Sequence, residues 1–469
     1  MSSVRMGRRR ALQVLGLGVA AVASARTEAE HADVPPGPRP TREQLAWQES
    51  ELTMFCHFGM NTFTGREWGD GTEAPRIFDP SELDAHQWAS AARDAGFRYF
   101  IFTAKHHDGF CLWPSRHTEH SVRHSPWRGG RGDLVREVAD ACRAAGLRLG
   151  IYLSPWDRHE RTYGDSPAYN AYFRAQLEEL LTQYGPVAEV WFDGACGEGP
   201  NGKRQEYDWP SFYEVVRRRQ PGALIAVVGP DVRWVGNEEG VARETEWSVQ
   251  PAVAGSRAIV GDQCWYPAES NTSIRPGWFW HAAEDDKVKS LDHLTDIYYR
   301  SVGRNSVLLL NVPPNRRGLF PDPDVTRLRE LRQRLDRSFG VDLARGARVV
   351  ASSTGTGSRP GAVTDGRPRT HWAPAEGQRT GWLELTLRAP ATFDVVMLQE
   401  HIALGQYVED YAVDAWDGAD WRPVCRGTTI GHKKLDRVAP VTAARIRVSI
   451  GKSRSRPHLR AVGLFRSAT

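Results

Sequence analysis

Side chains that could carry chemistry gather where short apolar runs of the sequence end. In chain order these ends hold His57-Phe58-Gly59, Lys105-His106-His107-Asp108-Gly109-Phe110, Tyr152 and Trp191-Phe192-Asp193-Gly194. A glycine-flanked loop further along holds Glu238 and Glu239. Carboxylates can attack, protonate or accept hydrogen bonds, and tryptophan offers a flat apolar face with a donor at its edge. This mixture, without a phosphate-binding loop, indicates a neutral polyol as the ligand.

Each of these signals also has a purely structural explanation. Asp-Gly after a strand is a common turn signal, and Glu238-Glu239 could simply be solvated. The pair His106-His107 could be a scaffold or could bind a metal ion. Neighbouring strand residues point to opposite faces, however, and no H-E-x-x-H segment is present. We therefore expect neither a catalytic metal nor another cofactor.

The pattern around these residues predicts the elements that position them. Near-continuous apolar runs alternate with stretches whose apolar residues recur every three or four positions. This predicts strands at 52–59, 97–106, 147–154, 187–194, 223–229 and 306–312, and helices at 79–95, 132–145, 167–184, 210–219, 287–303 and 323–338. The alternation predicts an α/β fold, a (β/α)8-type TIM-like barrel, because no glycine-rich dinucleotide loop is present. Strands six and seven, expected between 243 and 282, are poorly marked, so we expect irregularity there.

A barrel of this kind would bring the polar strand ends together. Its active site lies where the carboxyl ends of the strands meet. Glu67 and Trp68, in the loop after the first strand, would join the same rim. We expect the barrel to span residues 46–341.

The period of the sequence changes near residue 342. Short apolar stretches at 383–387, 394–399, 411–415 and 444–450 are separated by Gly, Pro and Asp turns. This spacing predicts a C-terminal antiparallel β-sandwich over residues 342–469.

The N-terminus has the pattern of an export signal. Arg8-Arg9-Arg10 precedes a short apolar stretch that ends in Ala23-Ser24-Ala25, and a stretch of this length is too short for a membrane anchor. The arginines favour a twin-arginine signal over a Sec signal. We expect residues 1–25 to be removed on export and residues 26–45 to form a flexible tether.

The net charge of the chain gives no electrostatic reason to expect a polyanionic partner. The whole sequence has a formal net charge of +4, and its first 25 residues contain four arginines and no acid. The exported part is therefore neutral, which gives no reason to expect binding to nucleic acid or to an anionic membrane.

One run of the sequence is specific enough to indicate a family. Residues 102–113, Phe-Thr-Ala-Lys-His-His-Asp-Gly-Phe-Cys-Leu-Trp, resemble the signature of the retaining α-L-fucosidases. The motifs His57-Phe58-Gly59, Glu67-Trp68 and Trp191–Gly194 occur in that family's order and spacing, and the resemblance covers roughly residues 46–340. It implies hydrolysis of terminal L-fucose from oligosaccharides or glycoconjugates through a fucosyl-aspartate intermediate.

The resemblance also implies roles for single residues. Asp193 takes the position of the nucleophile. The fucose hydroxyls would be held by His57, Glu67, Trp68, His106 and His107, with Tyr152 and Trp191 at matching strand ends.

The acid/base is less directly indicated. Gly236-Asn237-Glu238 is similar to a loop in the branch that acts on α-1,3- and α-1,4-linked fucose, where its Glu is the acid/base. The segments 152–157 and 274–279, the latter with Trp278, also look like that branch. Glu238 is thus the predicted acid/base, with Glu239, Glu244 and Glu246 as competitors. A retaining glycosidase needs an ionised and a protonated carboxyl about 5–5.5 Å apart, and a drier setting near Trp234 would suit the acid.

The C-terminal residues 362–372 are similar to discoidin or galactose-binding-like sandwiches. This domain could bind sugar, but we favour a structural sandwich that packs on the barrel and borders its cleft. Two alternatives to a fucosidase remain open: a catalytically silent lectin, and a glycosidase for another axial deoxysugar or a galactose-like unit.

Overall fold

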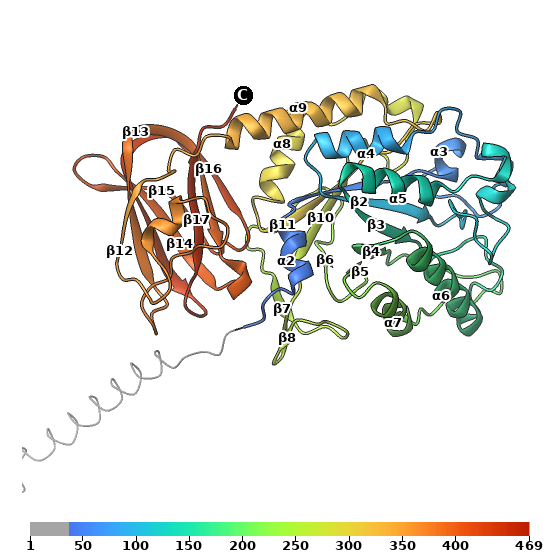
Figure 1. Cartoon of the computed structure of the whole chain (residues 1–469), viewed down its shortest axis with the longest axis horizontal. Helices are drawn as coiled ribbons and strands as arrows, with labels where there is room; N and C mark the ends of the chain where they lie inside the picture. Colours follow the sequence, from blue (N-terminus) through green and yellow to red (C-terminus); the bar gives the residue numbers. More distant parts are fainter. Residues whose placement is uncertain (1–36, 469) are drawn as a thin grey trace, which may run out of the picture.

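The computed structural model describes residues 37–468, which form two domains side by side (Figure 1). The predicted signal peptide and residues 26–36 of the predicted tether lie outside the described residues. The tether prediction extended too far, because helix α2 (Arg42–Gln48) begins inside it. Thr41 caps this helix through a reciprocal pair of hydrogen bonds with Gln44.

The first domain is the predicted barrel. Its parallel strands follow the order β5-β4-β3-β2-β1-β11-β10-β6, and a bridge between Ala226 and Val232 nearly closes the ring. The strands are β1 (Leu52–Cys56), β2 (Tyr99–Lys105), β3 (Arg148–Leu153), β4 (Glu189–Phe192), β5 (Leu224–Val227), β6 (Arg233–Trp234), β10 (Ala268–Ser273) and β11 (Ser306–Asn311). Most are near-continuous apolar runs because helices cover one face and the barrel interior the other.

Helices follow most of these strands along the chain. They are α3 (Met60–Thr64), α4 (Ala85–Asp94), α5 (Leu134–Ala145), α6 (Ser166–Gln183), α7 (Trp209–Arg219), α8 (Leu291–Arg300) and α9 (Asp322–Phe339). Helix α4 begins later than predicted because Asp84 accepts hydrogen bonds from the backbone N–H groups of His86 and Gln87.

The barrel is irregular at strands six and seven, as expected, but the sixth strand was predicted in the wrong place. Residues 228–232 alone separate β5 from β6, so β6 lies before residue 243. Strand β10 is fully buried although its sequence is Ala-Glu-Ser-Asn-Thr-Ser. Between β6 and β10 the chain forms a small sheet, β7 (Val249–Pro251), β8 (Ile259–Val260) and β9 (Gln263–Trp265), in place of a helix.

The second domain is the predicted β-sandwich. Its strands are β12 (Arg348–Ala351), β13 (Gly381–Glu400), β14 (Val408–Trp416), β15 (Trp421–Gly427), β16 (Lys434–Ser453) and β17 (Leu459–Phe465), all paired antiparallel. Two predicted strands, 383–387 and 394–399, are parts of the long strand β13. Trp372 is completely buried in the core of this domain.

The β-sandwich packs against the amino ends of the barrel strands. Glu51, just before β1, lies 3.1 Å from His432, and Asn305, just before β11, donates a hydrogen bond of 3.2 Å to Gln406. Figure 1 shows the same arrangement, with the sandwich at one end of the barrel. The expectation that the sandwich borders the cleft is therefore wrong, because the carboxyl ends of the strands lie at the other end.

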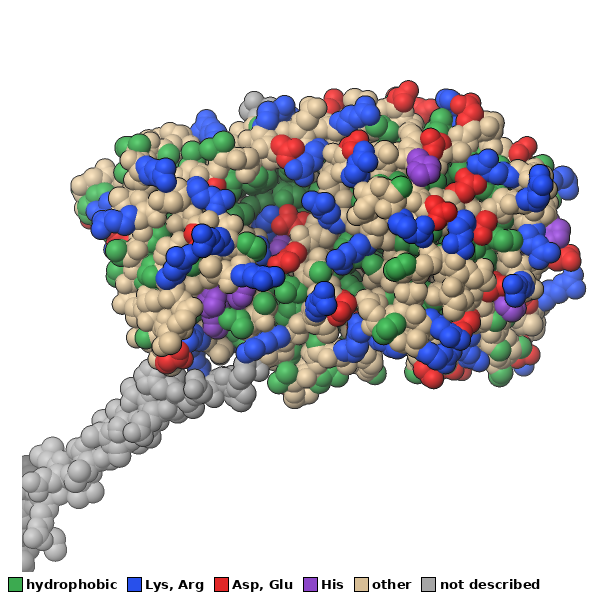
Figure 2. Space-filling view, in the orientation of Figure 1, with side chains coloured by type: hydrophobic (Ala, Val, Ile, Leu, Met, Phe, Trp, Pro, Cys, Tyr) green, Lys and Arg blue, Asp and Glu red, His purple; other side chains and the backbone are tan. Residues whose placement is uncertain are grey.

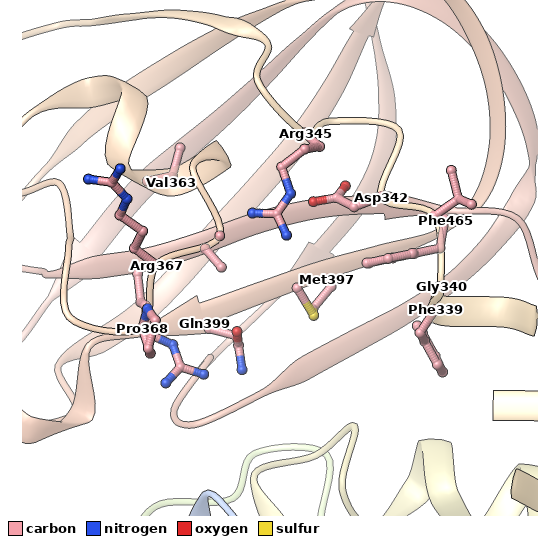
Figure 3. A pocket seen from close by; sticks show the side chains of 14 residues that line it. Phe339, Gly340, Asp342, Arg345, Val363, Arg367, Pro368, Met397, Gln399 and Phe465 are labelled. Atoms are coloured by element: carbon pink, nitrogen blue, oxygen red, sulfur yellow. The ribbon is translucent and has the colours of Figure 1, made fainter. Parts of the chain in front are cut away.

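A cavity of about 480 Å³ lies at this junction, and Figure 2 shows the surface hollowed between the domains. The end of α9 and several sandwich segments line it; Figure 3 shows Arg345 and Asp342 pointing toward each other above Met397. This cavity is remote from the polar strand ends. No helix among residues 37–468 is long and apolar enough to cross a membrane.

A buried ion pair fastens α9 to the barrel. Arg275, two residues beyond β10, donates to both carboxylate oxygens of Asp324, and both side chains are fully buried. Arg275→Met would leave Asp324 buried and unpaired, so we expect the free energy of unfolding to fall by about 3–5 kcal/mol. Urea denaturation measures this loss. Arg317→Met, which breaks an exposed pair with Glu82, is the matched control; an equal loss in both variants would contradict the prediction.

Candidate active site

A pocket of about 140 Å³ opens at the carboxyl ends of the barrel strands. Nine of the ten residues predicted for the site line it: His57, Trp68, His106, His107, Tyr152, Trp191, Asp193, Glu238 and Trp278. Phe55, Ala195 and Asn271 complete the lining. Every lining residue comes from the barrel domain.

Asp193 follows directly after β4 and is held from two sides. Its Oδ2 accepts a hydrogen bond of 3.1 Å from the hydroxyl of Tyr152, and its Oδ1 accepts one of 2.7 Å from the backbone N–H of Ala195. The Nε2 atom of His107 lies 4.0 Å from Oδ2. The two hydrogen bonds fix the direction of the carboxylate. Because the side chain is 27% exposed, it remains accessible from the pocket.

The hydrogen bonds of His57 fix which ring nitrogen carries its proton. Its Nδ1 lies 2.9 Å from Oδ1 of Asn311, whose amide nitrogen donates to Ser273 and to the carbonyl of Trp278. Asn311 Oδ1 is therefore the acceptor and Nδ1 of His57 the donor, which leaves Nε2 as an acceptor. Burial lowers the pKa of His57 to about 3, so the ring is neutral at neutral pH.

His106 and His107 both line the pocket, although alternation along a strand would separate them. Strand β2 ends at Lys105 with a shift of register, and the two rings lie 4.1 Å apart. Burial lowers the pKa of both, that of His107 to about 4. Among residues 37–468 no group of three or more His, Cys, Asp or Glu side chains could hold a metal ion.

These two histidines offer opposite groups to a ligand. Asn61 donates to Nδ1 of His106, which leaves Nε2–H of that ring as a donor. The Oγ atom of Ser154 donates to the carbonyl of Trp156 and so accepts from Nδ1 of His107. Nε2 of His107 is then an acceptor. Neutral rings that alternate donor and acceptor suit the hydroxyls of a sugar.

Glu238 is the carboxylate of its loop that reaches the pocket. Its Oε2 accepts a hydrogen bond of 3.1 Å from Nε1 of Trp278. Of its competitors, Glu244 pairs with Arg304 and Glu246 is buried beside Arg233, and none of the three lines the pocket. The drier setting expected near Trp234 is not found, because Glu238 is exposed. The indole of Trp234 instead donates to Asn271.

Glu67 is the one predicted site residue that does not line the pocket. Its carboxylate accepts hydrogen bonds from the backbone N–H groups of Trp278 and Phe279, at 2.8 and 3.3 Å, and lies 2.6 Å from Nε2 of His281. In this structure Glu67 thus orders the segment that carries Trp278.

Removing this carboxylate should loosen that segment without unfolding the protein. For Glu67→Ala we expect KM for a fucoside to rise about tenfold or more, because misplacement of a pocket wall by about 1 Å can cost as much as a hundredfold. Steady-state kinetics with a nitrophenyl fucoside measure the change. Glu284→Ala, which removes a single hydrogen bond to the same segment, at the N–H of Gly277, is the milder control. Unchanged KM in Glu67→Ala would contradict this role.

Asn271 and Asn311 are site residues that the sequence patterns missed. Asn271 lies in β10 and Asn311 ends β11, and both are buried. For Asn271 the signal was a strand of mostly polar residues, which an apolar-run criterion ignores. Asn311 ends an apolar run that was predicted as the strand 306–312, but its polar end was not recognised as part of the site. Asn271 lines the pocket, and Asn311 orients His57 from behind.

Taken together, the site presents two carboxylates, three neutral imidazoles and several indoles. Such a set recognises a small hydroxylated ring with one apolar face, and it has the two carboxyls that glycoside cleavage requires.

Comparison with known proteins agrees with this chemistry. The sequence profile of the α-L-fucosidase family matches residues 70–338, and that of the F5/8 type C domain matches residues 348–462. An Arabidopsis thaliana α-L-fucosidase 1 is 43% identical over 449 residues, covering 91% of this chain and 87% of the relative.

Solved structures show the same similarity. A GH29 fucosidase from Ruminococcus gnavus in complex with fucose has a TM-score of 0.85 at 33% identity, covering 93% of this chain and 97% of its own. A glycoside hydrolase 29 family member from a rumen bacterium has a TM-score of 0.82 at 39% identity, covering 93% and 78%. By this evidence the chain is a glycoside hydrolase that belongs to the GH29 α-L-fucosidase family and carries a C-terminal F5/8 type C domain.

Proposed function

We propose that this protein is an exported, retaining α-L-fucosidase that removes α-1,3- and α-1,4-linked L-fucose from branched glycans. The observation that carries the proposal is one pocket that holds both Asp193 and Glu238 together with the three histidines. Family membership supplies the fucosidase activity; the mechanism, the linkage and the export are the parts proposed here.

The first step is attack by Asp193 on the anomeric carbon. A carboxylate oxygen forms the new bond to C1, the bond from C1 to the leaving oxygen breaks, and Glu238 gives its proton to that oxygen. The hydrogen bonds from Tyr152 and from the N–H of Ala195 keep the carboxylate aimed into the pocket. The product is a fucosyl-aspartate ester.

The second step is hydrolysis of this ester. Glu238, now ionised, takes a proton from a water molecule whose oxygen attacks C1, and Asp193 leaves as a carboxylate. Two displacements at C1 restore the original configuration. His57, His106 and His107 hold the hydroxyls throughout, because neutral imidazoles donate and accept without changing charge.

The preference for branched glycans is supported by the rim of the pocket. Trp68 lines the pocket with 59% of its surface exposed, and Trp234, beside Asn271, is 37% exposed. Exposed indoles flanking a narrow pocket offer flat faces to sugars attached around the fucose. Glu238, the proposed acid/base, lines the same pocket as Trp68 and follows Trp234 by four positions in the chain.

A glycan screen tests the proposal. We expect release of fucose from Lewis-type trisaccharides, branched by α-1,3 or α-1,4 linkages, at least about a hundredfold faster than from linear α-1,2-fucosides, a difference in the range that pocket contacts can give. Fucose release is followed by chromatography. Equal rates, or faster α-1,2 cleavage, would remove the linkage assignment while leaving the family assignment intact.

The proposal also includes export of the protein by a twin-arginine signal. It is supported by Arg8-Arg9-Arg10 ahead of the short apolar stretch. Replacing Arg9 and Arg10 by lysine should retain the protein inside the cell, whereas a Sec signal would tolerate the change. Fractionation of cells that produce both versions decides between the two routes.

A further inference from the structure

Two carboxyl groups lie inside the barrel, beneath the pocket, with no role in the proposed reaction. Glu189 on β4 and Glu269 on β10 are both completely buried. The side chains packed in this interior are apolar or aromatic; they include Trp47, Phe55, Tyr99, Trp191, Leu224 and Leu309. Such surroundings strongly disfavour a charged carboxylate unless it is paired.

Each carboxyl group accepts one hydrogen bond from an indole. Nε1 of Trp47 donates to Glu189 at 3.0 Å, and Nε1 of Trp191 donates to Glu269 at 2.8 Å. The remaining oxygen of each group has no donor from any described residue, yet the two carboxyl groups interact with each other. Ionised carboxylates only accept hydrogen bonds, so a bond between two of them needs a proton.

The electrostatics agree that this proton is present. Burial, and then the neighbouring Glu269, raise the pKa of Glu189 well above its usual range. Burial likewise raises the pKa of Glu269 to about 7. Two neighbouring carboxyl groups in a low-dielectric interior cannot both be ionised near neutral pH.

We infer that Glu189 and Glu269 share a proton and act as a positioning pair that holds Trp191 in the wall of the fucose pocket. Trp191 is the link, because it lines the pocket while its indole N–H is bound to Glu269. Its ring lies 5.3 Å from that of Tyr152, which in turn donates to Asp193. The other end of the pair binds Trp47 of α2.

Other ionisable groups near the pair are few. The phenol of Tyr99 on β2 interacts electrostatically with Glu189 and with Glu43 on α2, and it accepts a hydrogen bond of 2.9 Å from Arg148 on β3. Burial raises the pKa of Tyr99, so this phenol is neutral when the pair titrates. Among the residues that the structure describes, no Lys, Arg or His forms an ion pair with either carboxyl group.

The stability of the folded protein depends on pH through Glu269. In the unfolded chain this group ionises near the usual glutamate pKa of 4.5, whereas in the folded protein its pKa is about 7. The pair therefore contributes stability that is fully present below the unfolded pKa and is lost as pH rises through about 7. Above that pH Glu269 becomes charged while Glu189 keeps the shared proton, so the buried charge destabilises the fold although Trp191 still has its acceptor.

The test compares Glu269→Gln, Glu269→Leu and the parent enzyme. An amide keeps the acceptor for Trp191 and donates permanently to Glu189, so Glu269→Gln should bind L-fucose within about threefold of the parent. It should also lose the decrease in the free energy of unfolding that the parent shows as pH rises through about 7. Glu269→Leu should bind fucose at least about tenfold more weakly at every pH. Calorimetric titration with L-fucose measures the affinities without using the acid/base, and urea denaturation at several pH values measures the stability.

A matched control comes from the β-sandwich. Glu400 is also buried with its pKa raised to about 7, but it accepts from the backbone N–H groups of Tyr407, Val408 and Gly431, far from the pocket. Glu400→Gln should leave the affinity for fucose unchanged at every pH. If Glu269→Leu fails to fold, an infrared difference spectrum of parent minus Glu269→Gln should still show the carbonyl band of a protonated carboxylic acid at neutral pH.

This inference rests on the proposed function, and the outcomes separate the two. Parent-like fucose binding by Glu269→Leu at all pH values, or no protonated carboxyl band, would overturn the positioning pair and leave the site intact. Unaltered fucose binding after His57→Ala would instead show that the sugar binds elsewhere, which would overturn the pocket assignment itself.

Discussion

Asp193→Asn should lower kcat/KM for every fucoside by at least about 10⁴-fold, the scale seen when a catalytic nucleophile is removed. The carboxamide keeps the size of the side chain. Its single oxygen can still accept from the N–H of Ala195, and its NH2 can donate to the hydroxyl of Tyr152, so the pocket should keep its shape. A neutral amide cannot form the ester with the sugar. Steady-state assays with a nitrophenyl fucoside measure the loss, and calorimetry with L-fucose should show that binding survives.

The control for this variant is Asp165→Asn. Asp165 precedes α6, is exposed, and makes no capping hydrogen bond with its side chain. It should keep parent-like turnover. Asp193→Ala guards against slow deamidation of Asn back to Asp, and activity near that of the parent in the alanine variant would eliminate Asp193 as nucleophile.

Glu238→Ala should separate substrates by their need for an acid. General acid catalysis contributes about 10²–10⁴-fold, so turnover of natural glycans should fall by that factor. A fucoside with an activated leaving group needs no protonation, and its fucosyl-enzyme should accumulate because the base of the second step is missing. Azide, a nucleophile that needs no base, should then restore turnover and give fucosyl azide with retained configuration.

The neighbouring carboxylates provide the comparison. Glu239→Ala changes an exposed side chain of the same loop and should have little effect. Glu246→Ala removes the buried partner of Arg233, so it should lower stability without creating azide rescue. Azide rescue in Glu246→Ala, and its absence in Glu238→Ala, would move the acid/base assignment to Glu246.

The elements that could be predicted are those whose burial produces a run or a period of apolar residues in the sequence. Strands such as β2 and β11 are covered on both faces and therefore contain continuous apolar runs, which were visible in the sequence. Strand β6 was missed because it has only two residues, too few for any period. Strand β10 lies within the range 243–282 expected for strands six and seven, but it was poorly marked because it is a buried strand of mostly polar residues.

The same reasoning explains what was predicted of the site. Asp193 could be placed because a carboxylate directly after a strand must lie on the rim. The contacts of Glu67 could not be predicted, because its partners Trp278 and Phe279 are more than two hundred positions away in the chain. His106 and His107 were expected on opposite faces because a register shift at a strand end leaves no trace in composition.

The β-sandwich and the pocket lie at opposite ends of the barrel, here called its back (the amino ends of the strands) and its front (their carboxyl ends). Glu51 and Asn305 meet the sandwich at the back, while the pocket opens at the front. A support, an affinity tag or a fusion partner attached at the C-terminus would thus face away from incoming glycans. The enzyme should consequently remain active when it is immobilised through its C-terminus, because the opening of the pocket then faces the solution.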